Sequence, residues 1–153
     1  PMRYMNQDRV FKVVSVSAFL TSHELQDSRK FGEGLRAAIE KYDGTVAVFA
    51  SGSLSHRFIW DREAARGMDS YTREWDRQVD KHVVGMWERG EWAEFTAMLP
   101  EYAEYCYGEG GMHDTAMLLG LLGWDKYDKP VEVLTPAFPS SGTGQINAVF
   151  PVE

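Results

Sequence analysis

The segment VFASGSLSHRF (48–58) decides the fold, because it joins an apolar run to a turn of small polar residues. The apolar run begins a few residues earlier, as TVAVFAS (45–51). β-Branched and aromatic residues favour a buried strand, and the Gly and Ser residues that follow mark its end. His56 lies just beyond that end. The sequence therefore predicts a strand whose carboxyl end carries an imidazole.

A second strand and a helix precede this segment. VFKVVSVSAFL (10–20) has the β-branched composition of a central strand. ELQDSRKFGEGLRAAIEKY (24–42) places apolar residues on one helical face, and Thr21 and Glu24 have the spacing of a capping box. The order strand–helix–strand favours a parallel pair joined by a right-handed crossover. We therefore expect an α/β fold with a mostly parallel or mixed sheet, helices packed on it, and a ligand site at the carboxyl ends of the strands.

The rest of the chain predicts helices followed by two strands around a turn-rich loop. In the first of these helices, the charges of WDRQVDK (75–81) are interpreted as a solvated face, and the aromatic residues Tyr71, Trp75 and Trp87 as part of the core. The predicted helices cover 70–90, 91–99, a short segment that Pro100 opens, and 113–124, and the predicted strands cover 131–138 and 146–152.

Length and composition indicate one domain, or part of one. The chain has 153 residues, of which 44% are hydrophobic, and a formal net charge of −7, which disfavours nucleic acid and anionic membranes as partners. Its single cysteine, Cys106, excludes an internal disulfide, favours a cytoplasmic location and is interpreted as a small buried residue. No segment resembles a membrane span or a signal peptide. The chain begins with Pro1 rather than Met, which we interpret as a fragment.

His56 is the first candidate for chemistry. A neutral imidazole at the end of a strand can accept and return a proton near pH 7, and the small residues around it leave room for a ligand. The alternative is a loop histidine that hydrogen-bonds backbone groups. A serine hydrolase is disfavoured, because the G-x-S-x-G pattern of a nucleophile elbow is absent.

The second candidate is YGEGGMHDT (107–115), which contains Glu109, His113 and Asp114. A carboxylate and imidazoles beside a glycine turn can supply metal ligands, and two histidines with one carboxylate form the facial triad of non-haem iron oxygenases. Adjacent helical residues point about 100° apart, so His113 and Asp114 are not expected to bind one ion together. The alternative role of Asp114 is to cap the helix that follows.

Long blocks of this sequence resemble the C-terminal half of the class III extradiol ring-cleavage dioxygenases, in the group that acts on 3,4-dihydroxyphenylacetate (homoprotocatechuate). The resemblance covers essentially the whole chain, so that residues 1–153 are expected to be the C-terminal part of a single catalytic domain. The blocks are PMRYMN (1–6), DGTVAVFASGSLSHRF (43–58), MDSYTREWDRQVD (68–80), MLPEYAEYCYGEGGMHDTAMLLGLLGWDKYD (98–128) and SSGTGQINAVFPV (140–152).

The resemblance implies an oxidoreductase of aromatic catabolism that opens a catechol ring with O2 at a non-haem Fe(II) site, forming a hydroxymuconic semialdehyde. His56 matches the family's acid–base histidine, which takes a proton from the catechol and returns it during ring cleavage. The carboxylate ligand of the iron matches Asp114 best, although the family has glutamate there, with Glu109 and His113 as the alternatives. The two histidine ligands belong to an N-terminal half that has no counterpart in this chain.

Ser55, Arg57 and Ser141 are the candidates for substrate binding, Arg57 because the acetate group of the substrate needs a cation. We expect the chain alone to bind iron weakly and to associate, either with itself or with the missing N-terminal half, through uncovered apolar faces. The rival hypothesis is a non-enzymatic binding or scaffold module of the same fold that lacks the metal half.

Overall fold

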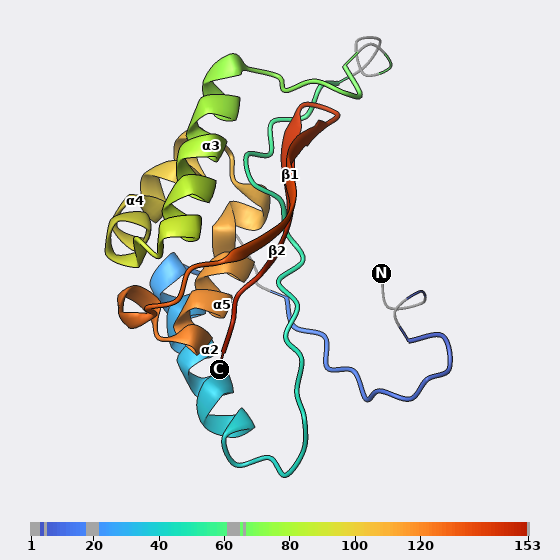
Figure 1. Ribbon diagram of the computed structural model, residues 1–153, viewed down its shortest axis with the longest axis vertical. Helices are drawn as coiled ribbons and strands as arrows, with labels where there is room; N and C mark the ends of the chain where they lie inside the picture. Colours follow the sequence, from blue (N-terminus) through green and yellow to red (C-terminus); the bar gives the residue numbers. More distant parts are fainter. Residues whose placement is uncertain (1–3, 5, 18–21, 61–64, 66, 153) are drawn as a thin grey trace.

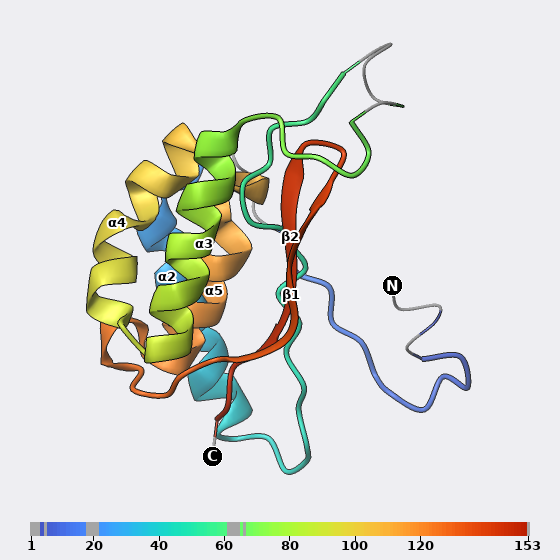
Figure 2. The ribbon, with the colours of Figure 1, turned by 45° about the horizontal axis from the view of Figure 1, so that its top comes forward.

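The computed structural model describes residues 4, 6–17, 22–60, 65 and 67–152. Four α-helices gather on one side of the molecule, and a β-hairpin runs along the other (Figures 1 and 2). No helix in these ranges is both long and apolar enough to cross a bilayer. The elements are α2 (Leu25–Ile39), α3 (Glu74–Arg89), α4 (Trp92–Tyr105), the 3-10 turn η2 (Glu109–Met112), α5 (His113–Leu122), the 3-10 turn η3 (Trp124–Lys126), β1 (Glu132–Ser140) and β2 (Thr143–Val149).

The core lies between α3, α4, α5 and the hairpin. Large side chains of these elements are almost completely buried and pack around Trp92, whose indole N–H donates to the carbonyl of Lys129 at 2.9 Å. Cys106 is fully buried, which confirms its interpretation as a core residue, and burial raises the pKa of its thiol to about 12. The largest fully buried apolar side chains are Trp92, Tyr102, Phe95, Leu54, Leu99, Met112, Leu119 and Val83.

Helix α2 packs against α5 through two glycines. A Cβ atom on Gly32 would overlap the carbonyl oxygen of Met117, and one on Gly120 would overlap the carbonyl oxygen of Arg29. The absence of side chains therefore lets the two helix backbones approach closely. Helix α2 begins at the N-cap Glu24, whose backbone N–H bonds to an Asp27 carboxylate, while the expected cap Thr21 lies outside the described residues.

The predicted helices after residue 70 are confirmed, with corrected boundaries: the first begins at Glu74 rather than residue 70, and the last ends at Leu122 rather than residue 124. Pro100 does not open a separate helix but lies inside α4, which continues to Tyr105. Helix α3 stops at Gly90, whose positive φ of 69° is a left-handed cap conformation that glycine adopts without strain. A short link then leads into α4, and the two helices pack side by side (Figure 2).

The interpretation of 75–81 as a solvated face is wrong for its two aspartates. Asp76 and Asp80 are completely buried, whereas Trp75, which was expected in the core, is half exposed. The reason is helical spacing, because Asp76, Asp80 and the buried residues Val83 and Trp87 recur every three or four positions along one stripe of α3. Charged residues are usually exposed to solvent, but these two aspartates are exceptions.

The two C-terminal strands are confirmed, but the parallel sheet is not. Strands β1 and β2 form an antiparallel two-stranded sheet, which bends at irregularities in its register. The described part of the first predicted strand, 10–17, and the second, 45–51, contain no assigned strand. Figure 1 shows residues 6–17 as an extended segment that lies apart from the helices. Residues 18–20 lie outside the described part.

A physical reason for this difference is the lack of neighbours. Both segments have strand composition, yet in the described part of the chain no strand hydrogen-bonds to them and no helix layer covers their apolar side chains. Their side chains are from 40% to 87% exposed. A parallel strand is stable only inside a sheet that is covered on both faces. The exposed apolar residues are Val10, Phe11, Val13, Val14, Val16, Val46, Val48 and Phe49.

The close contact between α2 and α5 can be tested with two glycines of the same helix. Gly32→Ala should lower the free energy of unfolding by about 1 to 3 kcal/mol, because the new methyl group meets backbone atoms that cannot move aside. Gly34→Ala should raise it by about 0.5 to 1 kcal/mol, because a Cβ there meets nothing and alanine favours the helix. Urea denaturation measures both, and a stable Gly32→Ala variant would contradict the packing.

Candidate functional site

The segment around His56 is held on both sides by backbone hydrogen bonds. On the β2 side, Leu54 N–H donates to the Gly144 carbonyl at 2.8 Å, and Gly144 N–H donates to the Ser55 carbonyl at 2.9 Å. On the other side, His56 N–H donates to the Cys106 carbonyl at 3.1 Å. The segment therefore lies between the start of β2 and the turn that follows α4.

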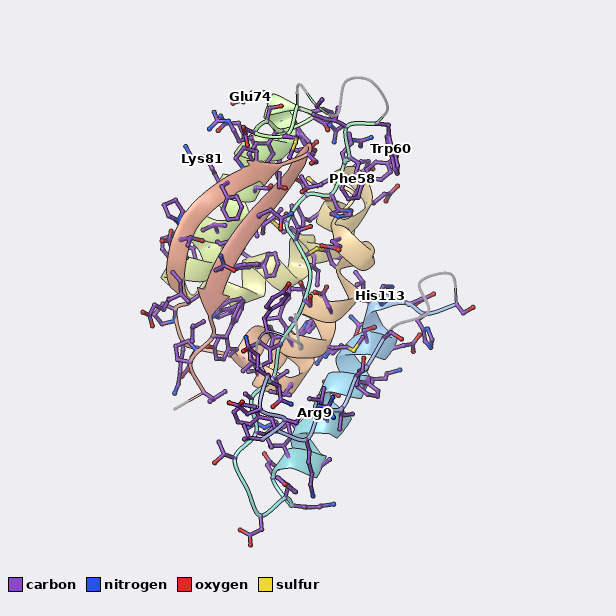
Figure 3. The ribbon with its side chains drawn as sticks, turned by 90° about the vertical axis from the view of Figure 1, so that its right-hand side faces the viewer. Arg9, Phe58, Trp60, Glu74, Lys81 and His113 are labelled. Carbon is purple, nitrogen blue, oxygen red and sulfur yellow. The ribbon has the colours of Figure 1, made fainter. Side chains whose placement is uncertain are left out.

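The His56 ring itself faces a carboxylate. Its Nε2 atom lies 3.7 Å from Oε1 of Glu109, and the two side chains are 22% and 40% exposed. The ring contacts Phe58 edge-on, with centroids 4.3 Å apart, and Phe58 in turn contacts Trp60 (Figure 3). His56 is thus neither sealed in the core nor remote from residues 109–114. Its ring can reach a ligand that lies beside Glu109.

The glycine turn before α5 positions Glu109. Its N–H donates to the Leu54 carbonyl at 3.3 Å, which ties the turn to the His56 segment. Gly110 and Gly111 both have φ near 60°, a left-handed conformation that glycine adopts at little cost. These two residues reverse the chain within η2, so that α5 starts directly beside Glu109.

Asp114 lies in the first turn of α5, against the His56 segment. The position of Gly52 is so close that a Cβ atom there would overlap the Asp114 carboxylate. Burial raises the pKa of Asp114 above its ordinary value, and the nearby Glu109 carboxylate raises it further, while backbone N–H groups at the helix start oppose both effects. Asp114 and Glu109 thus form a pair of mutually repelling carboxylates, of which Glu109 faces His56.

His113 faces a different neighbour. Its Nδ1 lies 2.7 Å from the Ser28 hydroxyl on α2, so its ring lies where α5 meets α2 (Figure 3). Burial lowers the pKa of this imidazole below its ordinary value. His113 and Asp114 are adjacent in sequence, yet one side chain is bound to α2 and the other lies against the segment that contains Gly52.

These residues do not make a complete iron site. Within the described ranges, no three His, Cys, Asp or Glu side chains are placed to hold one metal ion. A facial triad needs two histidines and one carboxylate, whereas His113 is turned toward Ser28 and His56 lies beside one carboxylate, that of Glu109. The arrangement can supply a carboxylate ligand and a proton-transfer group, but it needs further ligands.

The three predicted substrate-binding residues surround the same segment. Ser55 is fully buried and its hydroxyl donates to Asp80 at 2.7 Å. The Arg57 guanidinium stacks on the Tyr107 ring at 3.9 Å, and its Nε atom, which has no hydrogen-bond partner, lies 3.8 Å from an oxygen of Asp76. Ser141 lies in the hairpin turn, where its carbonyl accepts from Ile59 N–H at 3.0 Å. All three lie within or directly against the stretch that carries His56.

Comparisons with known proteins identify the family of this chain. Residues 1–151 match the family described as the catalytic LigB subunit of aromatic ring-opening dioxygenase. The chain is also similar to 3,4-dihydroxyphenylacetate 2,3-dioxygenase of Escherichia coli, with 67% identity over 138 residues. That match covers 90% of this chain and 50% of the relative, so the chain spans about half the length of the relative. The resemblance stated from the sequence is confirmed.

The cost of holding Asp114 beside Glu109 can be measured. Asp114→Asn should stabilise the metal-free chain at pH 7, because it removes a charge that burial and Glu109 disfavour. A carboxyl group whose pKa is higher in the folded than in the unfolded state destabilises the fold at pH values above the folded-state pKa. Below the unfolded-state pKa the group is protonated in both states and this destabilisation is absent. The gain should therefore shrink as the pH is lowered through the titration of Asp114.

Thermal unfolding in the presence of a chelator, at pH values from 3 to 7, would follow this difference. Asp125→Asn is the matched control, because its carboxylate is exposed and its replacement should change stability little. A loss of stability in Asp114→Asn at pH 7 would show that the carboxylate serves mainly as a helix cap.

Proposed function

This chain belongs to the LigB family of aromatic ring-opening dioxygenases, and we propose that it forms part of an enzyme that cleaves 3,4-dihydroxyphenylacetate with O2 beside its diol. The product is a hydroxymuconic semialdehyde, and the cofactor is non-haem Fe(II). The observation that carries the proposal is the partly exposed His56 ring, 3.7 Å from the Glu109 carboxylate and next to the start of α5.

His56 is the proton-transfer group in this proposal. Its imidazole is partly exposed, its backbone is fixed, and its ring nitrogen faces Glu109 rather than a permanent hydrogen-bond partner in the core. It can accept the proton of a catechol hydroxyl when the substrate binds, and it can return that proton as the ring opens.

Asp114 is the preferred carboxylate ligand of the iron, and Glu109 and His113 are the alternatives. Burial next to another carboxylate disfavours its charge, and a bound cation would relieve that repulsion. Bound Fe(II) would supply a site at which the catechol and O2 meet. The remaining ligands must come from outside the described residues, because none of these completes the site.

Substrate binding is assigned to the residues on either side of His56. The Arg57 side chain is 28% exposed, and its guanidinium can bind the carboxylate of an arylacetate. Ser55 and Ser141 complete this group indirectly, since their carbonyls accept hydrogen bonds from Gly144 and Ile59 and so hold the segment beside the substrate.

The partner of this chain is proposed to be the half of the enzyme that it does not match, with a homo-oligomer as the alternative. The relative has about as many residues again as the matched part. The exposed strand-like segments 10–17 and 45–51 are the surface that this half would cover, because they are apolar and rich in β-branched residues. A single buried cysteine fits a reducing compartment, so we place the enzyme in the cytoplasm.

The role of His56 can be tested in a completed enzyme, defined as this chain co-expressed with the half of the E. coli relative that it does not match. His56→Phe should lower kcat for 3,4-dihydroxyphenylacetate by at least about 10²-fold, because the proton acceptor is lost. Iron content and thermal stability should change little, since the ring is partly exposed. Oxygen uptake and the absorbance of the ring-opened product measure the rate.

The control is His82→Phe, because His82 lies on the exposed face of α3 and should not affect turnover. A non-enzymatic module predicts the opposite pattern for His56→Phe. In that case stability should fall, and any remaining activity should fall only in proportion to it.

Iron binding separates the chain from the completed enzyme. The chain alone should bind Fe(II) weakly, because its described residues do not provide three ligands in one place. The completed enzyme should retain close to one iron per active site after desalting. Elemental analysis measures both, and tight one-to-one binding by the chain alone would contradict the proposed division of the site.

A further inference from the structure

Two buried aspartates of α3 lie behind His56. Asp80 and Asp76 are one helical turn apart, and both are completely inaccessible to solvent. Asp80 contacts the residue before His56 and Asp76 contacts the residue after it. We propose that Asp80, assisted by Asp76, is a positioning residue that fixes Ser55 and Arg57 on α3 and thereby aims the His56 ring at Glu109. This inference rests on the proposed role of His56 in proton transfer.

Asp80 makes the stronger of the two attachments. Its Oδ2 accepts the Ser55 hydroxyl at 2.7 Å, and its Oδ1 accepts the Ser55 backbone N–H at 3.2 Å. The Tyr102 hydroxyl of α4 donates to the same Oδ1 at 2.8 Å. Gly144 of β2 lies so close that a Cβ atom there would overlap Oδ2. One carboxylate therefore joins α3, α4, β2 and the His56 segment.

The second attachment lies one turn earlier on α3. Arg73 holds the Asp76 carboxylate with two hydrogen bonds of 2.9 and 2.5 Å, and the Arg57 Nε lies 3.8 Å from the same group. The Thr72 hydroxyl donates to the Arg57 carbonyl. The residue after His56 is thus held through its side chain and its backbone by the beginning of α3.

The spacing of the two attachments matches the chain between them. Four residues of an α-helix rise about 6 Å, and two residues of chain span at most about 7 Å. Ser55 and Arg57 can therefore each meet an aspartate on consecutive turns, while the residue between them is left to face away from α3. His56 has no side-chain contact with either aspartate among the described interactions, and its ring meets Glu109 and Phe58 instead.

The Asp80 carboxylate is costly to bury, which argues for a role beyond packing. Burial raises the pKa of Asp80, and the donors Ser55 and Tyr102 only partly oppose this. An apolar residue at the same position of the α3 stripe would avoid this cost. The aspartate provides what an apolar side chain lacks, namely directed acceptors that hold the backbone of the His56 segment.

Amide hydrogen exchange of the chain tests the attachment without reference to activity. In Asp80→Asn, the amides of Ser55 and His56 should exchange about tenfold faster, because the charged acceptor is lost. The amides of α5 should keep their protection, which separates a local release from general destabilisation. Glu88→Gln, an exposed carboxylate on the same helix, is the matched control and should leave all these rates unchanged.

Kinetics of the completed enzyme test the consequence for His56. Asp80→Asn should lower kcat by about 10²-fold with little change in KM, because a displaced proton acceptor slows the reaction after the substrate has bound. In the His56→Phe background, the same substitution should cause no further loss of kcat, because both changes act through one group.

Two results would overturn the inference. The first is unchanged exchange at Ser55 and His56 relative to α5 in Asp80→Asn, and the second is faster exchange there with full kcat. If Asp80→Asn does not fold, Ser55→Ala removes one donor without altering the carboxylate, and it is judged by the same two measurements. Normal turnover by His56→Phe would reject the proposed function, while the exchange rates would still show whether Asp80 holds the segment.

Discussion

The burial of one carboxylate, that of Asp80, is the constraint on which the rest of the structure depends. A charge in a protein interior is tolerated only when donors surround it, and here the donors come from Ser55 and Tyr102. Those donors belong to different parts of the chain, so the helices must dock in one arrangement before the carboxylate is satisfied. The absence of a side chain at Gly144 lets β2 complete that arrangement. The same contact that orders the core therefore sets the place of the next residue, His56.

Local patterns were sufficient to predict the elements whose partners lie within the chain. The helix at 113–122 and the two C-terminal strands follow from apolar runs and turn residues, and their partners are present. The strands expected at 10–20 and 45–51 have equally clear composition, but a strand is stabilised by its neighbours. Their valines are exposed, so composition predicts that a segment is able to form a strand but does not predict whether a neighbouring strand is present.

The site was predictable where chemistry is local and not where it depends on packing. His56 could be chosen because it follows small residues at the end of a predicted strand, and Glu109 because it lies in a glycine turn, and the structure places the two side chains 3.7 Å apart. The two aspartates of α3 were misinterpreted, because charged residues are usually solvated. The signal was nevertheless present, since Asp76 and Asp80 continue the stripe of Val83 at helical spacing. A charge within a buried stripe indicates a specific partner.

Two carboxylates affected by burial differ in their surroundings: Asp80 is completely inaccessible to solvent, whereas Asp114 is only half-buried. Asp80 and Asp114 both have a raised pKa because of burial. The first receives hydrogen bonds from Ser55 and Tyr102 side chains, whereas the second receives them from backbone N–H groups at the start of α5 and faces the Glu109 carboxylate. Asp80 is thus held by donors from two other parts of the chain, whereas the charge of Asp114 is opposed by a second carboxylate. A cation would relieve the repulsion between Asp114 and Glu109, which is why we propose Asp114, and not Asp80, as the metal ligand.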